Sequence, residues 1–235
     1  MNGDPGVVHP LLHMMLAAAD GRFPPVDGAV EVVPPPAGGL ECSVAFTGHA
    51  VVATALSPTM VADQHPDGFG GSLSPDFLRW LAGGGGEVGT IDVTLVATGT
   101  GGGGPPERHD AVSHPRVRHA ARLRTGVRVF GDERGVVTVA AGLAGRRELS
   151  VEAVHDGQGR GWGRSLLADS LGLVPAGEVV FAAVSPGNAR SLRAFLSVGF
   201  QPVGSEVILR PRRRVRSRAA DVRFPGATHH TPPQR

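Results

Sequence analysis

The sequence predicts an α/β fold in which helices pack on a mixed α+β sheet. Helical and extended patterns alternate in short blocks between residues 116 and 209, which is typical of helices layered on a sheet. The chain has 235 residues, 41% of them hydrophobic, enough for at least one sizeable core. Its 35 Gly and 20 Pro gather in stretches such as 34–36, 83–86 and 101–106, which separate the structured blocks.

The first hundred residues predict a small α+β unit without a recognisable motif. The segment 40–56 is rich in Val, Ala and Thr and contains Gly48, so it fits either two strands or one bulged strand. Ser74 is placed to cap a helix whose apolar residues share one face. In order, we expect a helix over 9–19, a strand over 29–33, the strand or strands of 40–56, a helix with Phe77, Leu78 and Leu81 buried that ends at 83–86, and a strand over 90–97.

The second half shows stronger periodicity. The strand predicted over 178–184 is mostly apolar, which favours a central place in the sheet. The last helix opens at 186–188, should bury Leu192, Phe195 and Leu196, and stops at Gly199. The elements expected here are a helix over 116–124, strands over 127–130, 136–141 and 148–154, a helix over 162–172, the strand over 178–184, the helix after 188 and a final strand over 202–209.

The composition divides the chain into three parts. We predict an N-terminal α+β region over 1–108, a second domain over 109–210 and a disordered basic tail over 211–235, with a linker near 100–112. Residues 210–235 hold eight Arg and one Asp, a net charge of +7, so the rest of the chain carries −5. The arginine run over 210–218 has no aromatic residues between its arginines, and the tail contains several Pro, which favours a solvated segment over nucleic-acid binding.

The cysteine content and the lengths of the apolar stretches indicate the cellular compartment. Cys42 is alone, so no disulfide forms within the chain, and a reducing compartment is expected. The sequence has neither a signal peptide nor a stretch of about 18 apolar residues. We therefore expect a cytoplasmic protein without a membrane partner.

The glycine-rich loop Gln158-Gly159-Arg160-Gly161-Trp162-Gly163 lies between a predicted strand and a predicted helix. Glycines allow close approach of the backbone to a pyrophosphate, and the free N–H groups of a helix's first turn favour an anion. The dinucleotide pattern G-x-G-x-x-G fails in every register, and a P-loop needs a Lys, which this chain lacks.

The loop does match Q/R-x-x-G-x-G, the pyrophosphate loop of GNAT acyltransferases. A second block, Asn188 to Phe200, is similar to that superfamily's N-x-x-[SA]-x-x-x-[YF]-x-x-x-G-F signature and follows the loop after one strand. The chain therefore resembles a GNAT-type, acetyl-CoA-dependent N-acetyltransferase over residues 115–210.

The resemblance implies a GNAT-like fold in which two central strands splay apart and admit the pantetheine arm of acetyl-CoA. Backbone groups near Ala153 and His155 would bond that arm, and Asn188 and Ser191 would contact it from the other side. The pyrophosphate would be held by main-chain N–H groups of Gln158, Gly159, Arg160, Gly161, Trp162 and Gly163, with Arg164.

The resemblance further implies direct attack of an amine on the thioester, helped by a carboxylate or a bound water as base. Glu148 and Glu152 are the candidate catalytic residues. Residues 148, 150 and 152 share one strand face, and Glu152 lies nearer the acyl end, so it is preferred. Phe195 stands where many relatives carry a Tyr as acid; a CoA thiolate can leave without full protonation.

The acceptor is a primary amine of a small molecule or a peptide that the sequence does not identify. One alternative is a CoA-binding or regulatory GNAT-like module without turnover, suggested by Phe195. A weaker alternative is a nucleic-acid-associated protein that uses the Arg tail. The N-terminal region could cover the acceptor side or form a homodimer.

No metal site is expected, because the ten His fall in no ligand pattern. We interpret them as structural or surface residues. His155 is the exception worth testing, since it would lie beside the acyl site.

Overall fold

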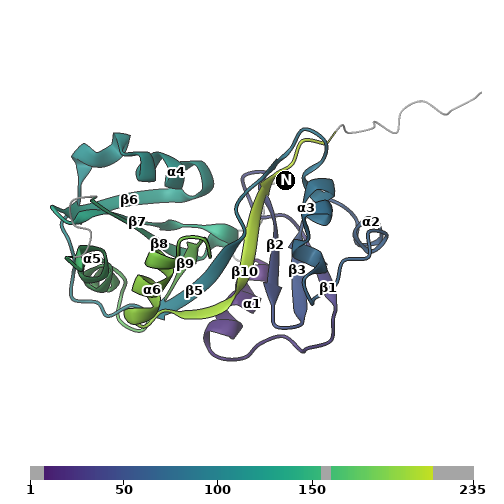
Figure 1. Ribbon diagram of the computed structural model, residues 1–235, viewed down its shortest axis with the longest axis horizontal. Coiled ribbons are helices and arrows are strands. Elements are labelled where there is room, and N and C mark those ends of the chain that lie inside the picture. The colour runs from purple at the N-terminus through teal and green to yellow at the C-terminus, as the bar shows by residue number, and fades with distance from the viewer. Residues whose placement is uncertain (1–7, 155–159, 214–235) are drawn as a thin grey trace, which may run out of the picture.

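A computed structural model describes residues 8–154 and 160–213 of the chain. Within these ranges it forms a 10-stranded mixed sheet with helices on its faces (Figure 1). The predicted α/β fold with a mixed α+β sheet is therefore confirmed. The strand order is β1-β3-β2-β10-β5-β9-β8-β7-β6, with β4 paired to β10.

The strands follow the predicted ones closely. Residues 40–56 form two strands joined at Gly48, which settles the choice between a hairpin and one bulged strand. The strands are β1 (Val30–Val33), β2 (Glu41–Phe46), β3 (His49–Ala53), β4 (Glu87–Val88), β5 (Asp92–Thr98), β6 (Thr125–Asp132), β7 (Gly135–Ala141), β8 (Arg147–Ala153), β9 (Val179–Val184) and β10 (Gln201–Arg210).

The helices begin where local sequence signals place them. Ser74 caps the helix that follows it, accepting a hydrogen bond from the N–H of Phe77, and a Pro occupies its first turn. The α-helices are α1 (Pro10–Ala19), α2 (Pro58–Ala62), α3 (Pro75–Ala82), α4 (Pro115–Leu123), α5 (Trp162–Ser170) and α6 (Ala189–Ser197).

Two details differ from the sequence prediction. Leu196, expected to be buried, is 43% exposed, because α6 turns Phe195 rather than Leu196 toward the core. The short helix α2 and the short strand β4 lie in segments for which we predicted neither a helix nor a strand.

The sheet crosses the boundary that we predicted near residue 108. β5, from the first part of the chain, lies between β9 and β10 and pairs with both. β10 in turn pairs with β2 on its other side. The division into domains thus stays a prediction, while the strands of the two parts are interleaved in one sheet.

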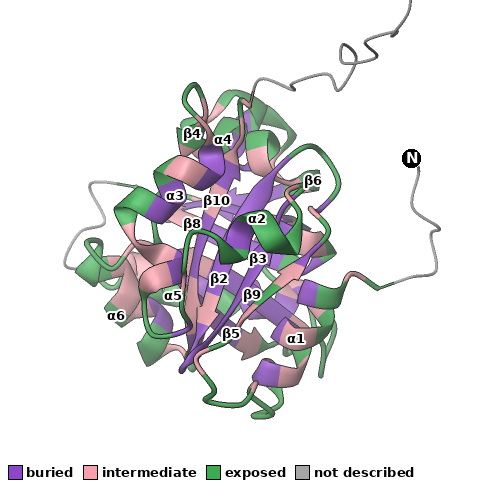
Figure 2. Cartoon of the chain, turned by 90° about the vertical axis from the view of Figure 1, so that its right-hand side faces the viewer, coloured by how far each residue is buried: buried purple, intermediate pink, exposed green. Residues whose placement is uncertain are grey.

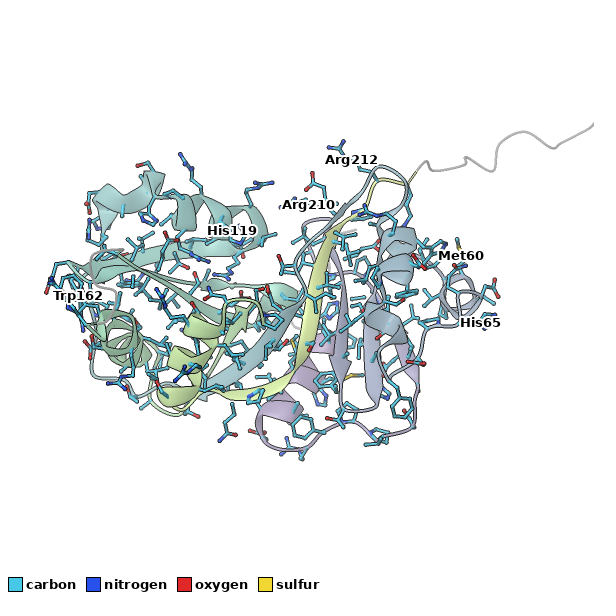
Figure 3. The ribbon with its side chains drawn as sticks, viewed as in Figure 1. Met60, His65, His119, Trp162, Arg210 and Arg212 are labelled. Atoms are coloured by element: carbon cyan, nitrogen blue, oxygen red, sulfur yellow. The ribbon has the colours of Figure 1, made fainter. Side chains whose placement is uncertain are left out.

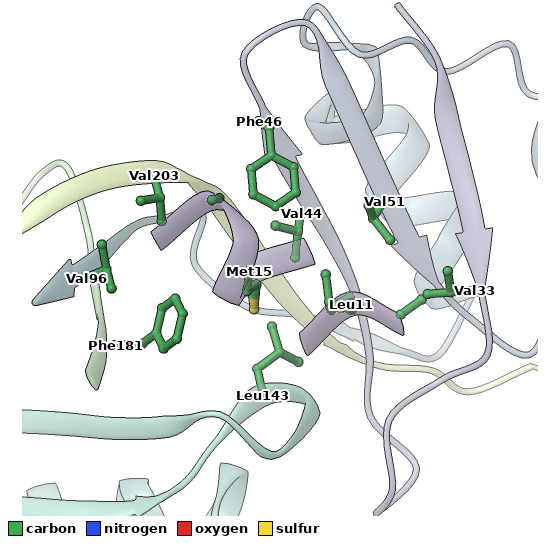
Figure 4. Packing of buried hydrophobic residues seen from close by; sticks show 13 residues of the cluster. Leu11, Met15, Val33, Val44, Phe46, Val51, Val96, Leu143, Phe181 and Val203 are labelled. Carbon is green, nitrogen blue, oxygen red and sulfur yellow. The ribbon is translucent and has the colours of Figure 1, made fainter. Parts of the chain in front are cut away.

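A shared core joins these interleaved parts. Leu11 and Met15 of α1 are fully buried and lie between side chains of both parts (Figure 4). The first part contributes Val33, Val44 and Val51, and the second contributes Leu143, Phe181 and Val203.

The helices of the second half cover opposite faces of its strands. α4 packs on β6 and β7, whereas α5 packs on β7 and β8 from the other side (Figure 1). Figure 2 shows buried residues concentrated on strands of the sheet such as β2, β3 and β10, while the helices around them carry exposed residues. Among the described residues, no helix is long and apolar enough to cross a membrane.

Candidate active site

The two central strands β8 and β9 diverge. They run parallel, yet in the described residues they are joined at the single pair Glu148↔Phe181. By contrast, β7 pairs with β8 all the way from Gly135↔Ala153 to Ala141↔Arg147. The sheet therefore opens between β8 and β9 beyond Glu148, toward the carboxyl ends of both strands.

A cavity of about 230 Å³ lies at this opening. Its walls come from β8, the end of β9, and the helices α4 and α6. A second cavity, of about 280 Å³, extends between α4 and strands β4 and β10. The two cavities share the lining residues Thr90, Asp92, His119, Leu123, Glu206 and Ile208, so they form one groove.

The start of α5 lies next to the end of β8. A Cβ added to Gly163 would lie 3.4 Å from the Cβ of Ala153. Gly161 caps the helix with a left-handed φ of 76°, and no side chain of residues 8–154 or 160–213 accepts a hydrogen bond from the N–H groups of its first turn. The guanidinium of exposed Arg160 lies 5.6 Å from the Trp162 ring centre, and Arg164 is exposed.

Three residues of the predicted cofactor site, His155, Gln158 and Gly159, lie outside the described residues. Their roles stay predictions.

The second motif forms the start of α6. The side-chain oxygen of Asn188 accepts a hydrogen bond from the N–H of Ser191 at 3.1 Å, which caps the helix. Asn188, Ser191 and Phe195 all line the cavity. The Phe195 ring also packs edge-on against Phe200, with centroids 4.9 Å apart. Because residue 195 is Phe and not Tyr, it brings no hydroxyl group to the cavity.

Glu148 is held between two arginines. It is 3% exposed and forms ion pairs with Arg124 and, at 3.1 Å, with Arg146. Burial raises the pKa of the Glu148 carboxyl, but the two guanidiniums outweigh it and leave the pKa below its ordinary value. A carboxylate stabilised in this way is a weak proton acceptor.

Glu152, the preferred candidate base, lies farther out on the same strand face. Its carboxylate pairs with the Nε of Arg116 at 3.1 Å, and its side chain is 43% exposed. The cavity wall includes Glu148 and Ser150 but stops short of Glu152. The structure thus brings Glu148 to the cavity and places Glu152 at its edge.

A buried ion pair lies behind the cavity and was not predicted. Arg146 donates to both carboxylate oxygens of Glu206, at 2.6 and 2.7 Å, and the Thr94 hydroxyl donates to Glu206 at 2.6 Å. Arg146 is 1% exposed and Glu206 is 2% exposed. Arg146 directly precedes β8 and Glu148 lies on it, and this spacing of two residues could have suggested the Arg146–Glu148 ion pair but not the pair with Glu206.

Two titratable residues at the cavity were also missed. Asp92 lines both cavities, and burial, followed by the charges of Glu206 and Glu148, raises its pKa to about 6. His119, interpreted from the sequence as a structural or surface residue, lies on the sheet-facing side of α4 (Figure 3). Burial and the nearby Arg116, Arg124 and Arg122 lower the pKa of His119, which favours the neutral imidazole.

No group of three or more His, Cys, Asp or Glu residues suited to a metal ion occurs within residues 8–154 and 160–213.

Comparisons with known proteins return similar structures. No protein-family description matches the sequence, and no curated protein does. One similar structure, from Novosphingobium aromaticivorans, is named as a GNAT-family acetyltransferase; the identity is 16%, the TM-score 0.39, and the match covers 55% of this chain and 69% of that one. Another is a GCN5-related N-acetyltransferase from Kribbella flavida, with 16% identity, a TM-score of 0.31, and coverage of 53% and 59%.

Proposed function

We propose that the protein is an N-acetyltransferase that moves an acetyl group from acetyl-CoA to a primary amine of a small molecule or peptide. The observation that carries the proposal is the opening between β8 and β9, with a cavity at its mouth. Strand edges freed in this way offer backbone N–H and C=O groups to an extended, amide-containing ligand. The pantetheine arm of CoA is such a ligand.

The size and surroundings of the cavity fit the acyl end of this substrate. About 230 Å³ holds a thioester and part of the arm but not a nucleotide, which must lie outside. The N–H groups in the first turn of α5, beside Ala153, are suited to the pyrophosphate. In this arrangement Ala153, Asn188 and Ser191 flank the arm, and Arg160, Gly161, Trp162, Gly163 and Arg164 hold the phosphates, together with Gln158 and Gly159 from the sequence motif.

The test is release of free thiol from acetyl-CoA in the presence of a panel of primary amines, with acetyl-CoA binding measured by calorimetry. We expect binding, and turnover with at least one amine. Binding without thiol release across the panel would favour the alternative of a CoA-binding module, which the absence of a hydroxyl group at Phe195 suggests. No binding at all would contradict both.

A substitution in the phosphate loop tests the placement of the ligand. Gly161→Glu puts a carboxylate at the proposed pyrophosphate site, and we expect at least a tenfold loss of acetyl-CoA affinity because like charges repel. Gly177→Glu is a matched control: both glycines have a left-handed φ, 76° and 81°, with open space at the Cβ position. Equal affinity in both variants would place the pyrophosphate elsewhere.

A further inference from the structure

Asp92 lies at the open end of the gap between β8 and β9. The antiparallel pairs of β5 and β9 end at Val93↔Val184, and Asp92 is the next residue on β5. It lines the cavity at the gap together with Ser185, and it also lines the second cavity under α4. A group that entered along the groove toward the gap would pass the Asp92 carboxylate.

The buried carboxylates that line the cavity are already neutralised. Glu148 is paired with Arg124 and Arg146, and Glu206 is paired with Arg146 and accepts from Thr94. Asp92 forms no ion pair with any residue of the described ranges. Two arginines thus balance two glutamates, and Asp92 is the carboxylate left over.

We propose that Asp92 accepts the proton of the acceptor amine, which reaches it along the groove between α4 and β10. The inference rests on the acetyltransferase function proposed above. The amine nitrogen bonds to the thioester carbonyl carbon, and the C–S bond breaks with its electron pair going to sulfur. The nitrogen loses one proton to the Asp92 carboxylate, and solvent carries that proton on to the CoA thiolate.

The surroundings of Asp92 suit this role. Its pKa of about 6 leaves the carboxylate ionised at neutral pH, yet makes it a better proton acceptor than an ordinary aspartate. Burial raises the pKa of Asp92 most; Glu206 on β10 and Glu148 on β8 raise it further, while Arg146 and Arg116 lower it. His119, on α4, also lines the groove, and burial and the nearby arginines lower the pKa of its imidazole, so it is a second candidate proton acceptor.

The test compares Asp92→Asn with wild type, using an amine that wild type acetylates. We expect kcat/KM to fall by about 10²–10⁴-fold, with unchanged affinity for acetyl-CoA. The fall of wild-type kcat/KM on the acid side, near pH 6, should disappear in the variant. Asp63→Asn, at the exposed end of α2, is the matched control and should keep wild-type kinetics.

A stability measurement gives an independent readout. The pKa of Asp92 rises from 3.8 to about 6 on folding, so its ionisation opposes folding above pH 6, and this effect vanishes below pH 3.8. Asp92→Asn should therefore raise the melting temperature at pH 8 and leave it nearly unchanged at pH 4. A loss of activity in a more stable protein cannot be attributed to misfolding.

The outcomes separate the two proposals. Suppose that wild type releases thiol, and that Asp92→Asn keeps both the wild-type kcat/KM and its fall on the acid side. The assignment of Asp92 is then wrong, while the acetyltransferase function stands. If the fall of kcat/KM on the acid side disappears in His119→Gln and persists in Asp92→Asn, the histidine is the proton acceptor instead. If wild type binds acetyl-CoA and turns over no amine, the proposed function fails, and Asp92 has no proton to accept.

Discussion

Arg146 carries a positive charge inside the molecule. Its guanidinium reaches Glu206 and Glu148 and lies near the sulfur of Met15, on the helix that joins the two parts of the core. Removing one partner of such a network leaves the remaining buried charges uncompensated, and this usually costs more than the network contributes as a whole.

Arg146→Met should therefore lower the free energy of unfolding by about 3–5 kcal/mol. The neighbouring Arg147→Ala is the control, because its ion pair with Glu178 is exposed and such pairs contribute roughly 0–1 kcal/mol. Urea unfolding followed by circular dichroism measures both. Similar small losses for the two variants would show that the buried carboxylates find other partners.

For individual residues, the sequence predicted part of the candidate site. The alternation of residues 148, 150 and 152 placed two carboxylates on one strand face, and their ion pairs with Arg116 of α4 and with Arg124 directly after α4 agree with that face. The sequence did not reveal that Glu148 would be neutralised, because Arg124 comes from another element. Asp92 was missed for a similar reason: it belongs to the segment before the predicted linker, and only strand pairing brings it to the cavity.

The hairpin between β6 and β7 depends on a glycine. Gly135 has a φ of 154°, and a Cβ built there would lie 2.2 Å from the carbonyl oxygen of Glu152 on β8. A side chain at this position would push β7 away from the candidate site.

Gly135→Ala should cost roughly 1–3 kcal/mol, because it combines backbone strain with a clash against backbone that cannot rotate away. Gly84→Ala, where a Cβ meets nothing within 4 Å, should change stability by less than about 0.5 kcal/mol. Thermal unfolding of the two variants measures the difference. A Gly135→Ala protein as stable as wild type would mean that β7 and β8 can separate without loss.

Single elements were predictable because their signals are local. Ser74 with Pro75 marks a helix start, alternation marks β5, and a mostly apolar run marks β9. His9 and His114 cap α1 and α4 through their ring nitrogens, a use of histidine that we did not foresee. The order of strands is not local, since the neighbours of β10 are β2 and β5, which are far from it in the sequence.

At the scale of the whole molecule, the interleaved sheet implies cooperative unfolding. β10 cannot leave β2 without also disturbing β5, and α1 fills a core that both parts share. The two tryptophans report on different regions, Trp80 on α3 and Trp162 on α5.

We therefore expect one unfolding transition for the entire chain. In the single-tryptophan variants Trp80→Phe and Trp162→Phe, fluorescence and circular dichroism should give the same urea midpoint within each variant. Comparison within a variant removes any effect of the substitution on overall stability. Two separated midpoints would show that the parts before and after residue 108 unfold as independent domains.

The central claim is that the opening between β8 and β9 receives the arm of acetyl-CoA, and amide hydrogen exchange with and without acetyl-CoA tests it most directly. The account predicts slower exchange in peptides that cover β8, the first turn of α5 and the start of α6, with no change in β1 and β3 at the far edge of the sheet. Unchanged exchange at β8, α5 and α6 under saturating acetyl-CoA, or protection confined to other elements, would contradict it.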